Sequence, residues 1–118
     1  MVRSQLTSAA KLVQAAPLFA ALGDETRLEL VARLCTEGPQ SIVRLTDGTS
    51  VSRQAVTKHL HALAEAGLVR SAREGRERIW QIQTKRLSDV RRYLEQISRQ
   101  WDEALERLRF AVEEGADE

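Results

Sequence analysis

Residues 51–69, VSRQAVTKHLHALAEAGLV, decide the fold of this chain. If they form a helix, Val56, Leu60 and Leu63 lie on one apolar stripe. Five polar side chains then fan out on the opposite side: Arg53, Gln54, Thr57, Lys58 and His61. Arginine and lysine supply charge and donors, and a glutamine amide suits an adenine edge. The pattern predicts a helix that can enter a DNA major groove, and an ordinary solvated helix face is the alternative interpretation.

The residues before this helix predict a shorter helix and a turn. Ser41 can cap a helix that runs through Thr46, with Ile42 and Leu45 facing inward. Residues 47–50, Asp-Gly-Thr-Ser, are typical of a turn. Two helices joined by a short glycine-containing turn, the second with an exposed basic and polar face, form the helix-turn-helix pattern.

Another helix is predicted upstream, over residues 25–35. Asp24 is well placed to cap its start, and Gly38-Pro39 is well placed to end it. Its predicted buried stripe has four members: Leu28, Val31, Ala32 and Leu34. Cys35, the single cysteine of the chain, is expected to pack as a small buried apolar group. A reversible thiol switch at Cys35 is the alternative interpretation.

A β-hairpin is predicted after the helix-turn-helix. Residues 69–73 and 77–82 flank Glu74-Gly75-Arg76, which has the size of a tight hairpin loop. In the return strand, Trp80 and Ile82 are expected to face the core. Three arginines of this hairpin, or wing, are predicted to lie near a phosphate backbone or a minor groove: Arg73, Arg76 and Arg78. A charged hairpin tip that only keeps the surface soluble is the alternative.

The clearest periodic pattern comes last in the chain. Apolar residues recur there in alternating steps of three and four: Leu87, Val90, Leu94, Ile97, Trp101, Ala104, Leu108 and Ala111. This pattern predicts a helix over about residues 88–113, and a first helix is predicted over about residues 5–16. A small winged domain cannot cover so long a seam, so we predict a homodimer rather than packing within one chain. The predicted interface residues are Leu6, Leu12, Val13, Leu94, Ile97, Trp101, Leu105 and Leu108.

Length and composition favour a single domain that spans residues 1–118, with a core over about residues 18–83. Aromatic residues make up 4% and charged residues 30% of the chain, which favours helices over a sandwich or barrel. The net charge of +1 is unevenly distributed. Residues 53–80 hold six basic and three acidic side chains, whereas residues 102–118 hold two basic and seven acidic ones. The basic middle is therefore expected to meet phosphate, and the acidic tail to stay clear of it.

Several classes of protein do not fit the sequence. No apolar run approaches the roughly 20 residues of a membrane span, and residues 1–14 lack the pattern of a signal peptide. We therefore expect a cytoplasmic protein without a membrane partner. Ser52 and His59 lie two turns apart on one helix, too far apart to form a triad with Asp47. Since a glycine-rich phosphate loop is also missing, we expect no catalytic residues and no enzyme activity.

Taken together, these motifs resemble the bacterial arsenic-repressor-like (ArsR) family of winged-helix transcription regulators. The matching segments are Leu18–Leu28 (LFAALGDETRL), Ser52–Leu60, Ala66–Val69 and the wing residues Arg73–Arg76. The resemblance implies a dimeric repressor that binds an inverted-repeat operator in double-stranded DNA until a signal releases it. It also implies that five residues face the major groove: Ser52, Arg53, Gln54, Thr57 and Lys58.

The chain departs from the metal-sensing members of that family. Those members carry a cysteine pair in the first helix of the helix-turn-helix, where this chain has Ser-Ile-Val-Arg-Leu-Thr at residues 41–46. Other members bind zinc through carboxylates and histidines on the last helix, but Asp89 and Glu95 have no histidine near them. Carboxylates alone make a poor zinc site. We expect no metal and no cofactor, and any inducer is an unknown small molecule.

The leading hypothesis is sequence-specific binding of double-stranded DNA by a homodimeric repressor, with the helix of residues 52–65 in the major groove. Base contacts from Arg53 and Gln54 are expected to set specificity, while Lys58 and the wing arginines supply a salt-dependent contribution. One alternative is a protein-interaction module that uses the winged fold without DNA readout. Another is a regulator that responds to oxidation through Cys35.

Overall fold

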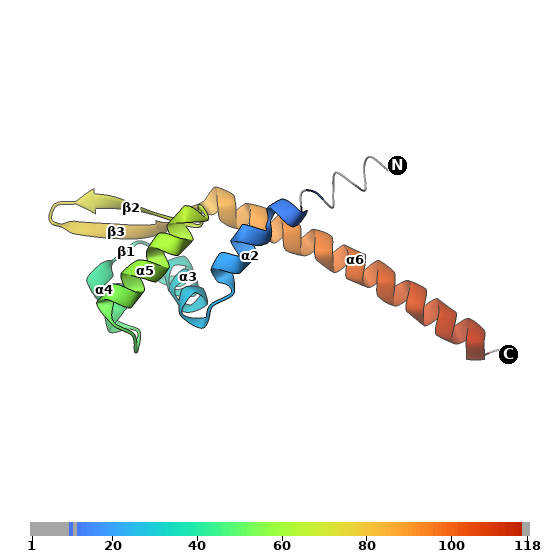
Figure 1. The fold of residues 1–118 in the computed structure, drawn as a ribbon. Coiled ribbons are helices and arrows are strands. Elements are labelled where there is room, and N and C mark those ends of the chain that lie inside the picture. The colour runs from blue at the N-terminus through green and yellow to red at the C-terminus, as the bar shows by residue number, and fades with distance from the viewer. Residues whose placement is uncertain (1–9, 11, 117–118) are drawn as a thin grey trace.

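A computed structural model describes residue 10 and residues 12–116 of the chain. Its elements are α2 (Ala16–Leu22), α3 (Glu25–Glu37), β1 (Gln40–Ser41), α4 (Ile42–Asp47), α5 (Arg53–Glu65), β2 (Val69–Glu74), β3 (Glu77–Ile82) and α6 (Thr84–Ala116). Figure 1 shows α2 to α5 and the strands gathered into one body, from which α6 runs out as a long rod. The predicted architecture, mainly helical with a small β wing, is confirmed.

Polar side chains cap the N-termini of two helices at the positions that the sequence predicted. The Asp24 Oδ1 atom accepts a hydrogen bond from the Arg27 backbone N–H at 3.0 Å, at the start of α3. The Ser41 Oγ atom accepts from the Arg44 backbone N–H at 3.3 Å, at the start of α4. Each cap satisfies a donor that the first helical turn leaves unpaired. Local chemistry therefore fixes where these helices begin.

The core is built around α5. Val56, Leu60 and Leu63 are each 0% exposed, as the sequence predicted. They join a cluster to which α2, α3, α4, the sheet and the start of α6 all contribute: Leu18, Leu30, Leu34, Leu45, Leu68, Val69, Trp80 and Val90. Burial of these side chains is the main source of stability, at roughly 25 cal/mol per Å² of apolar surface.

The buried face of α3 differs from the predicted one. Leu30, Val31 and Leu34 are buried, whereas Leu28 is 52% exposed and Ala32 is exposed. Arg27 takes the inward position that completes the stripe, and its Nη1 atom donates to the Ala21 carbonyl at 3.2 Å. The prediction failed because a half-buried arginine was not counted among the inward residues.

The prediction that Cys35 is buried is also wrong. Helix α3 continues beyond Cys35 to Glu37, and Gly38 ends it with a φ of 81°. Leu34 points into the core, so its neighbour Cys35 lies on the outer side of the helix with its thiol exposed.

The sheet has one more strand than predicted. Its order is β1-β3-β2, and both pairings are antiparallel. Trp80 on the central strand lies opposite Gln40 of β1 and Ser71 of β2, and it is 3% exposed. The wing turn is two residues long, Gly75-Arg76, because Glu74 and Glu77 still pair across the strands. Gly75 has a φ of 62°, a conformation that glycine adopts without strain.

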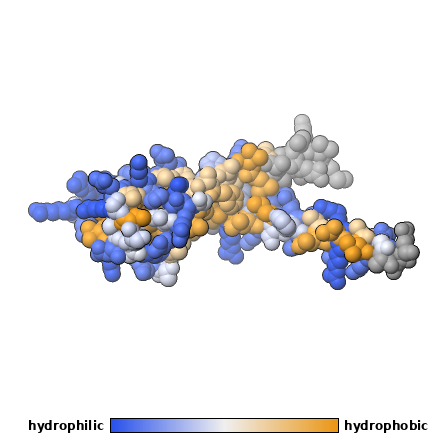
Figure 2. All heavy atoms as spheres, turned by 60° about the horizontal axis from the view of Figure 1, so that its bottom comes forward, coloured by the Kyte–Doolittle hydropathy of each residue, from blue (hydrophilic) through white to orange (hydrophobic). Residues whose placement is uncertain are grey.

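Helix α6 is longer than the predicted 88–113. It spans 33 residues, or about 50 Å at 1.5 Å per residue, and accounts for much of the 71 Å length of the described part. Its first turns pack on the core through Val90, Leu87 and Tyr93. From Ser98 to Gly115 the helix is exposed, and Figure 2 shows apolar side chains along this free part. Among the described helices, none is long and apolar enough to cross a bilayer.

The predicted first helix, residues 5–16, lies mostly outside the described residues, and so does Leu6. Residues 12–14 are helical. Of the other predicted interface residues here, Leu12 is half-buried and Val13 is 72% exposed. Ile97, on α6, is half-buried as well.

Two leucines on α3 offer a matched test of this packing. We expect Leu30→Ala to lower the free energy of unfolding by about 2–5 kcal/mol, because Leu30 is 0% exposed and its loss leaves a cavity. Leu28→Ala, on the exposed side, should cost less than about 0.5 kcal/mol. Urea unfolding at one fixed protein concentration measures both values. Equal losses in the two variants would contradict the observed orientation of α3.

Candidate nucleic-acid interface

The outer side of α5 carries the polar residues that the sequence predicted there. Arg53, Gln54, Lys58 and His61 are exposed, and Thr57 is half-buried. Because the inner side of the helix is fully buried, the side chains on its outer side point to solvent. Their chemistry is that of a surface that meets phosphates and base edges.

Two hydroxyl groups at the start of α5 also bond to the helix itself. The Ser52 Oγ atom accepts from the Ala55 backbone N–H at 3.1 Å and so caps the helix. Its own O–H remains free to donate to an external acceptor. The Thr57 hydroxyl donates to the Arg53 carbonyl at 2.9 Å, which leaves its oxygen to accept. Both predicted contact residues therefore have a structural role that the sequence analysis did not assign.

The wing brings two arginines face to face. Arg73 and Arg78 are direct partners in the register of β2 and β3, so they lie on the same face of the hairpin. Like charges directly opposite each other destabilise a strand pair. The Arg78 Nη1 atom donates to Ser71 Oγ at 2.9 Å, and Arg76 stands exposed in the turn. The face of the wing that carries Arg73 and Arg78 is thus cationic, and a bound anion would relieve the repulsion between them.

A ring contact joins α5 to the wing. The His61 and Trp80 ring centroids are 5.7 Å apart at an angle of 86°, an edge-to-face arrangement. Side chains alternate along β3, so Arg78 lies on the same face of the hairpin as Trp80. The ring contact therefore links the outer side of α5 to the face of the wing that carries Arg73 and Arg78. We define the polar face as the polar residues at the start and on the outer side of α5 together with the wing arginines: Ser52, Arg53, Gln54, Thr57, Lys58, His61, Arg73, Arg76 and Arg78.

Arg33 braces the helix-turn-helix from behind, and the sequence analysis missed it. Its Nη1 atom donates to the Leu45 carbonyl at 2.7 Å, and its Nη2 atom donates to the Arg44 carbonyl at 2.9 Å. These carbonyls lie in the last turn of α4, where carbonyl groups have no hydrogen-bond donor within the helix. The contacts join residues 11 and 12 positions apart, so no local pattern reveals them. A side chain at Gly48 would collide with the Arg33 guanidinium.

The two histidines of the chain have different neighbours. His61 faces Trp80, whereas the His59 Nδ1 atom lies 3.8 Å from Asp24 Oδ1. The Arg27 backbone N–H, donating to the carboxylate, holds the pKa of Asp24 below its ordinary value, and His59 adds to that effect. The Asp24–His59 contact ties the start of α3 to the middle of α5. No cluster of three or more His, Cys, Asp or Glu residues within residues 10 and 12–116 is arranged to hold a metal ion.

Comparison with known proteins finds helix-turn-helix transcriptional regulators. A helix-turn-helix domain family matches residues 22–72, which run from the end of α2 into β2. The chain is 36% identical over 85 residues to the HTH-type transcriptional regulator Rv2034 of Mycobacterium tuberculosis, covering 72% of this chain and 76% of that one.

Solved structures share the fold. An ArsR-like transcriptional regulator from Rhodococcus sp. RHA1 is 40% identical, with a TM-score of 0.67 and coverage of 86% of this chain and 92% of that one. A homodimeric winged helix-turn-helix DNA-binding domain from Mycobacterium bovis, described as a possible ArsR-family regulator, is 27% identical, with a TM-score of 0.61. The matched region covers 78% of this chain and 83% of that one.

The Arg33 brace can be tested with a double-mutant cycle. Arg33→Ala and Gly48→Ala should each lower the free energy of unfolding, by about 1–3 kcal/mol, because each removes the guanidinium from the α4 carbonyls. In the Arg33→Ala background, Gly48→Ala should cost almost nothing, since no guanidinium remains to be displaced. Thermal or urea unfolding of the four proteins gives the coupling. Strictly additive losses would show that the two residues do not act on each other.

Proposed function

Because this chain belongs to the ArsR-like family of helix-turn-helix transcriptional regulators, we propose that it is a homodimeric repressor of an inverted-repeat operator. Each protomer inserts α5 into a major groove, and its wing follows the neighbouring backbone. The observation that carries the proposal is the polar face, which combines the exposed polar side chains of α5 with the exposed arginines of the wing. A dimer bound at the operator prevents transcription of the adjacent gene.

In this proposal the first residues of α5 contact the base edges. Recognition helices contact base edges mainly through their N-terminal residues, and Arg53 and Gln54 are the first two residues of this helix. An arginine suits the acceptors of guanine, and a glutamine suits the donor and acceptor of adenine. Lys58 lies more than a turn further along the exposed side and supplies charge to a phosphate. Ser52 and Thr57 add short polar contacts beside them.

The wing supplies contacts to the backbone that do not depend on sequence. Arg73, Arg76 and Arg78 are all exposed, and the first and last of them oppose each other across the hairpin. A phosphate between such arginines replaces repulsion with charge-assisted hydrogen bonds. Each neutralised phosphate releases counterions, so this part of the affinity falls as salt rises.

The dimer rests on α6 and on the segment before α2. Large apolar side chains of α6 stay exposed in the single chain: Leu94, Trp101, Leu105, Leu108, Phe110 and Val112. Exposed apolar patches of this extent mark interaction surfaces. The domain from Mycobacterium bovis, which shares this fold, is homodimeric. In our proposal Val13 and Leu12 join the α6 residues in the interface, and the acidic end of α6 stays away from DNA.

The first test measures binding to the DNA upstream of the protein's own gene. A mobility-shift assay at about 50 and about 200 mM salt gives the affinity. We expect a complex that survives an excess of unrelated duplex. With about six phosphate contacts, affinity should fall by about 10³-fold between the two salt concentrations. A complex lost equally to any duplex would rule out specific recognition. Salt-independent binding would point to apolar protein docking instead.

Single substitutions distinguish residues that recognise bases from residues that bind the phosphate backbone. Gln54→Ala should compress the differences in affinity among operator variants, by about 1–3 kcal/mol at the adenine it contacts. Arg76→Ala should weaken every duplex alike and reduce the salt slope by about 1. Arg107→Ala, which removes an exposed arginine from the far part of α6, is the matched control and should change neither quantity. If Gln54→Ala left the ranking of operator variants unchanged, the role given to Gln54 would be wrong.

A further inference from the structure

A groove of about 400 Å³ lies between α2, the start of α3 and the C-terminal end of α5. We call it the α2–α5 groove. Seven residues line it, and four of them are alanines: Ala20, Ala21, Ala62 and Ala66. Pockets that bind small molecules have volumes of about 300–1,000 Å³ and apolar walls with a few polar groups. The size and lining of the α2–α5 groove therefore suit a small ligand.

Arg27 contributes an incompletely paired guanidinium to this groove. Its Nη1 atom donates to the Ala21 carbonyl at 3.2 Å, which fixes the side chain. Its Nε atom is buried and has no hydrogen-bond partner in the described part of the chain. Buried donors in native proteins are paired in the great majority of cases, and a guanidinium has five N–H donors. Because Arg27 is only half-buried, a ligand in the groove can supply the missing acceptor.

Glu65 contributes a negative charge to the same groove. It is the last residue of α5, and it is exposed. Within residues 10 and 12–116, neither Glu65 nor Arg27 takes part in an ion pair. The C-terminal end of a helix also carries a partial negative charge. The groove thus presents a cation and an anion that do not neutralise each other.

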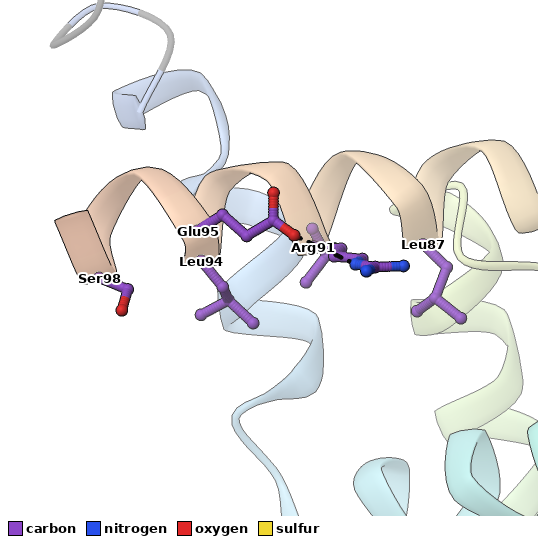
Figure 3. Close-up of a pocket in the computed structure, with 6 residues that line it drawn as sticks. Leu87, Arg91, Leu94, Glu95 and Ser98 are labelled. Atoms are coloured by element: carbon purple, nitrogen blue, oxygen red, sulfur yellow. Dashed lines mark hydrogen bonds and ion pairs between the residues drawn. The ribbon is translucent and has the colours of Figure 1, made fainter.

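The charges at another groove of the molecule are paired. This second groove has a volume of about 460 Å³ and lies on α6, where Leu87 and Leu94 line it. The Arg91 Nε atom donates to Glu95 Oε1 at 3.2 Å beside it, as the dashed line in Figure 3 shows. That groove belongs to the surface of α6 that we assigned to the dimer. The α2–α5 groove differs because both of its charges remain available to a ligand.

We propose that the α2–α5 groove binds a small zwitterion, whose carboxylate pairs with Arg27 and whose ammonium group lies at Glu65. A carboxylate matches the forked donors of a guanidinium. A ligand with only a negative charge is repelled by Glu65, and one with only a positive charge is repelled by Arg27. A molecule with both charges avoids each repulsion, and its apolar part packs on the alanines. Small α-amino acids belong to this chemical class.

The bound molecule joins α3, through Arg27, to the last residue of α5, through Glu65. This site lies at the other end of α5 from Arg53 and Gln54, which we propose to contact bases. The inference does not depend on DNA binding, because the ligand is measured without DNA.

Three matched probes test the site on the full chain: L-leucine, 4-methylpentanoate and 3-methylbutylamine. The second probe lacks the ammonium group and the third lacks the carboxylate, while the apolar part is the same. Titration of ¹⁵N-labelled protein, followed by NMR, reports the backbone amides of the four alanines. We expect saturable shifts with L-leucine. Binding should be about two- to fivefold weaker for 4-methylpentanoate, and at least about tenfold weaker for 3-methylbutylamine.

Substitutions at the rim locate the binding site without touching Arg27. Glu65→Gln should weaken binding of L-leucine about two- to fivefold and should not weaken binding of 4-methylpentanoate. Ala20→Leu places a larger side chain in the groove from an exposed position of α2, and it should abolish binding of every probe. Ala32→Leu is the matched control, since Ala32 is an exposed alanine of α3 outside the groove. It should leave binding unchanged.

Arg27→Gln tests the carboxylate contact itself. We expect it to weaken binding of L-leucine at least about tenfold, because it removes a charge-assisted hydrogen bond. Arg27 also holds the Ala21 carbonyl, so thermal unfolding of this variant is recorded beside the titration. If Arg27→Gln does not fold, 3-methylbutylamine gives the same comparison on the unaltered chain.

Each outcome supports or overturns the inference. The predicted order of the three probes, together with loss of binding in Ala20→Leu, supports a zwitterion site. Equal affinities for L-leucine and 4-methylpentanoate would show that Glu65 takes no part, which overturns the assignment of the ligand. No shift at the four alanines with L-leucine, or binding that persists in Ala20→Leu, overturns the site. Neither failure affects the proposed function, which is measured with DNA alone.

Discussion

The complete burial of one side of α5 is the constraint on which the rest of the structure depends. Val56, Leu60 and Leu63 are each 0% exposed, and they anchor a helix of only 13 residues in the centre of the body. Since a helix has fixed geometry, burying these three side chains sets its rotation about its own axis. Arg53, Gln54 and Lys58 must then point to solvent. The chemistry of the outer side follows from the packing of the inner side.

Other parts of the molecule hold α5 in that position. Ser52 fixes its start, Asp24 contacts His59 at its middle, and Trp80 meets His61 one turn before its end. Arg33 holds α4, the helix that precedes the turn into α5. Preorganisation of this kind lowers the ordering cost of binding. The polar face is thus held in place from several sides, and in the dimer that we propose α6 relates two such faces.

Local signals explain which parts the sequence could predict. The caps at Asp24 and Ser41 and the inner stripe of α5 depend on neighbouring residues, and all were predicted correctly. The burial of α3 was predicted wrongly because Arg27, a charged residue, occupies an inward position through a carbonyl contact. Strand β1 is two residues long and has no readable period. The Arg33 brace and the opposed wing arginines depend on contacts and register that only the folded chain reveals.

In the function that we propose, α5 reads base edges in two successive major grooves. The most direct test substitutes 7-deazapurines, one position at a time, in the duplex that the chain binds most tightly, because this change removes only the N7 acceptor of the major groove. We expect affinity to fall at purines in two segments that are related by a dyad and lie about one helical turn, roughly 34 Å, apart. Undiminished affinity at every position would show that the chain binds DNA without reading the major groove.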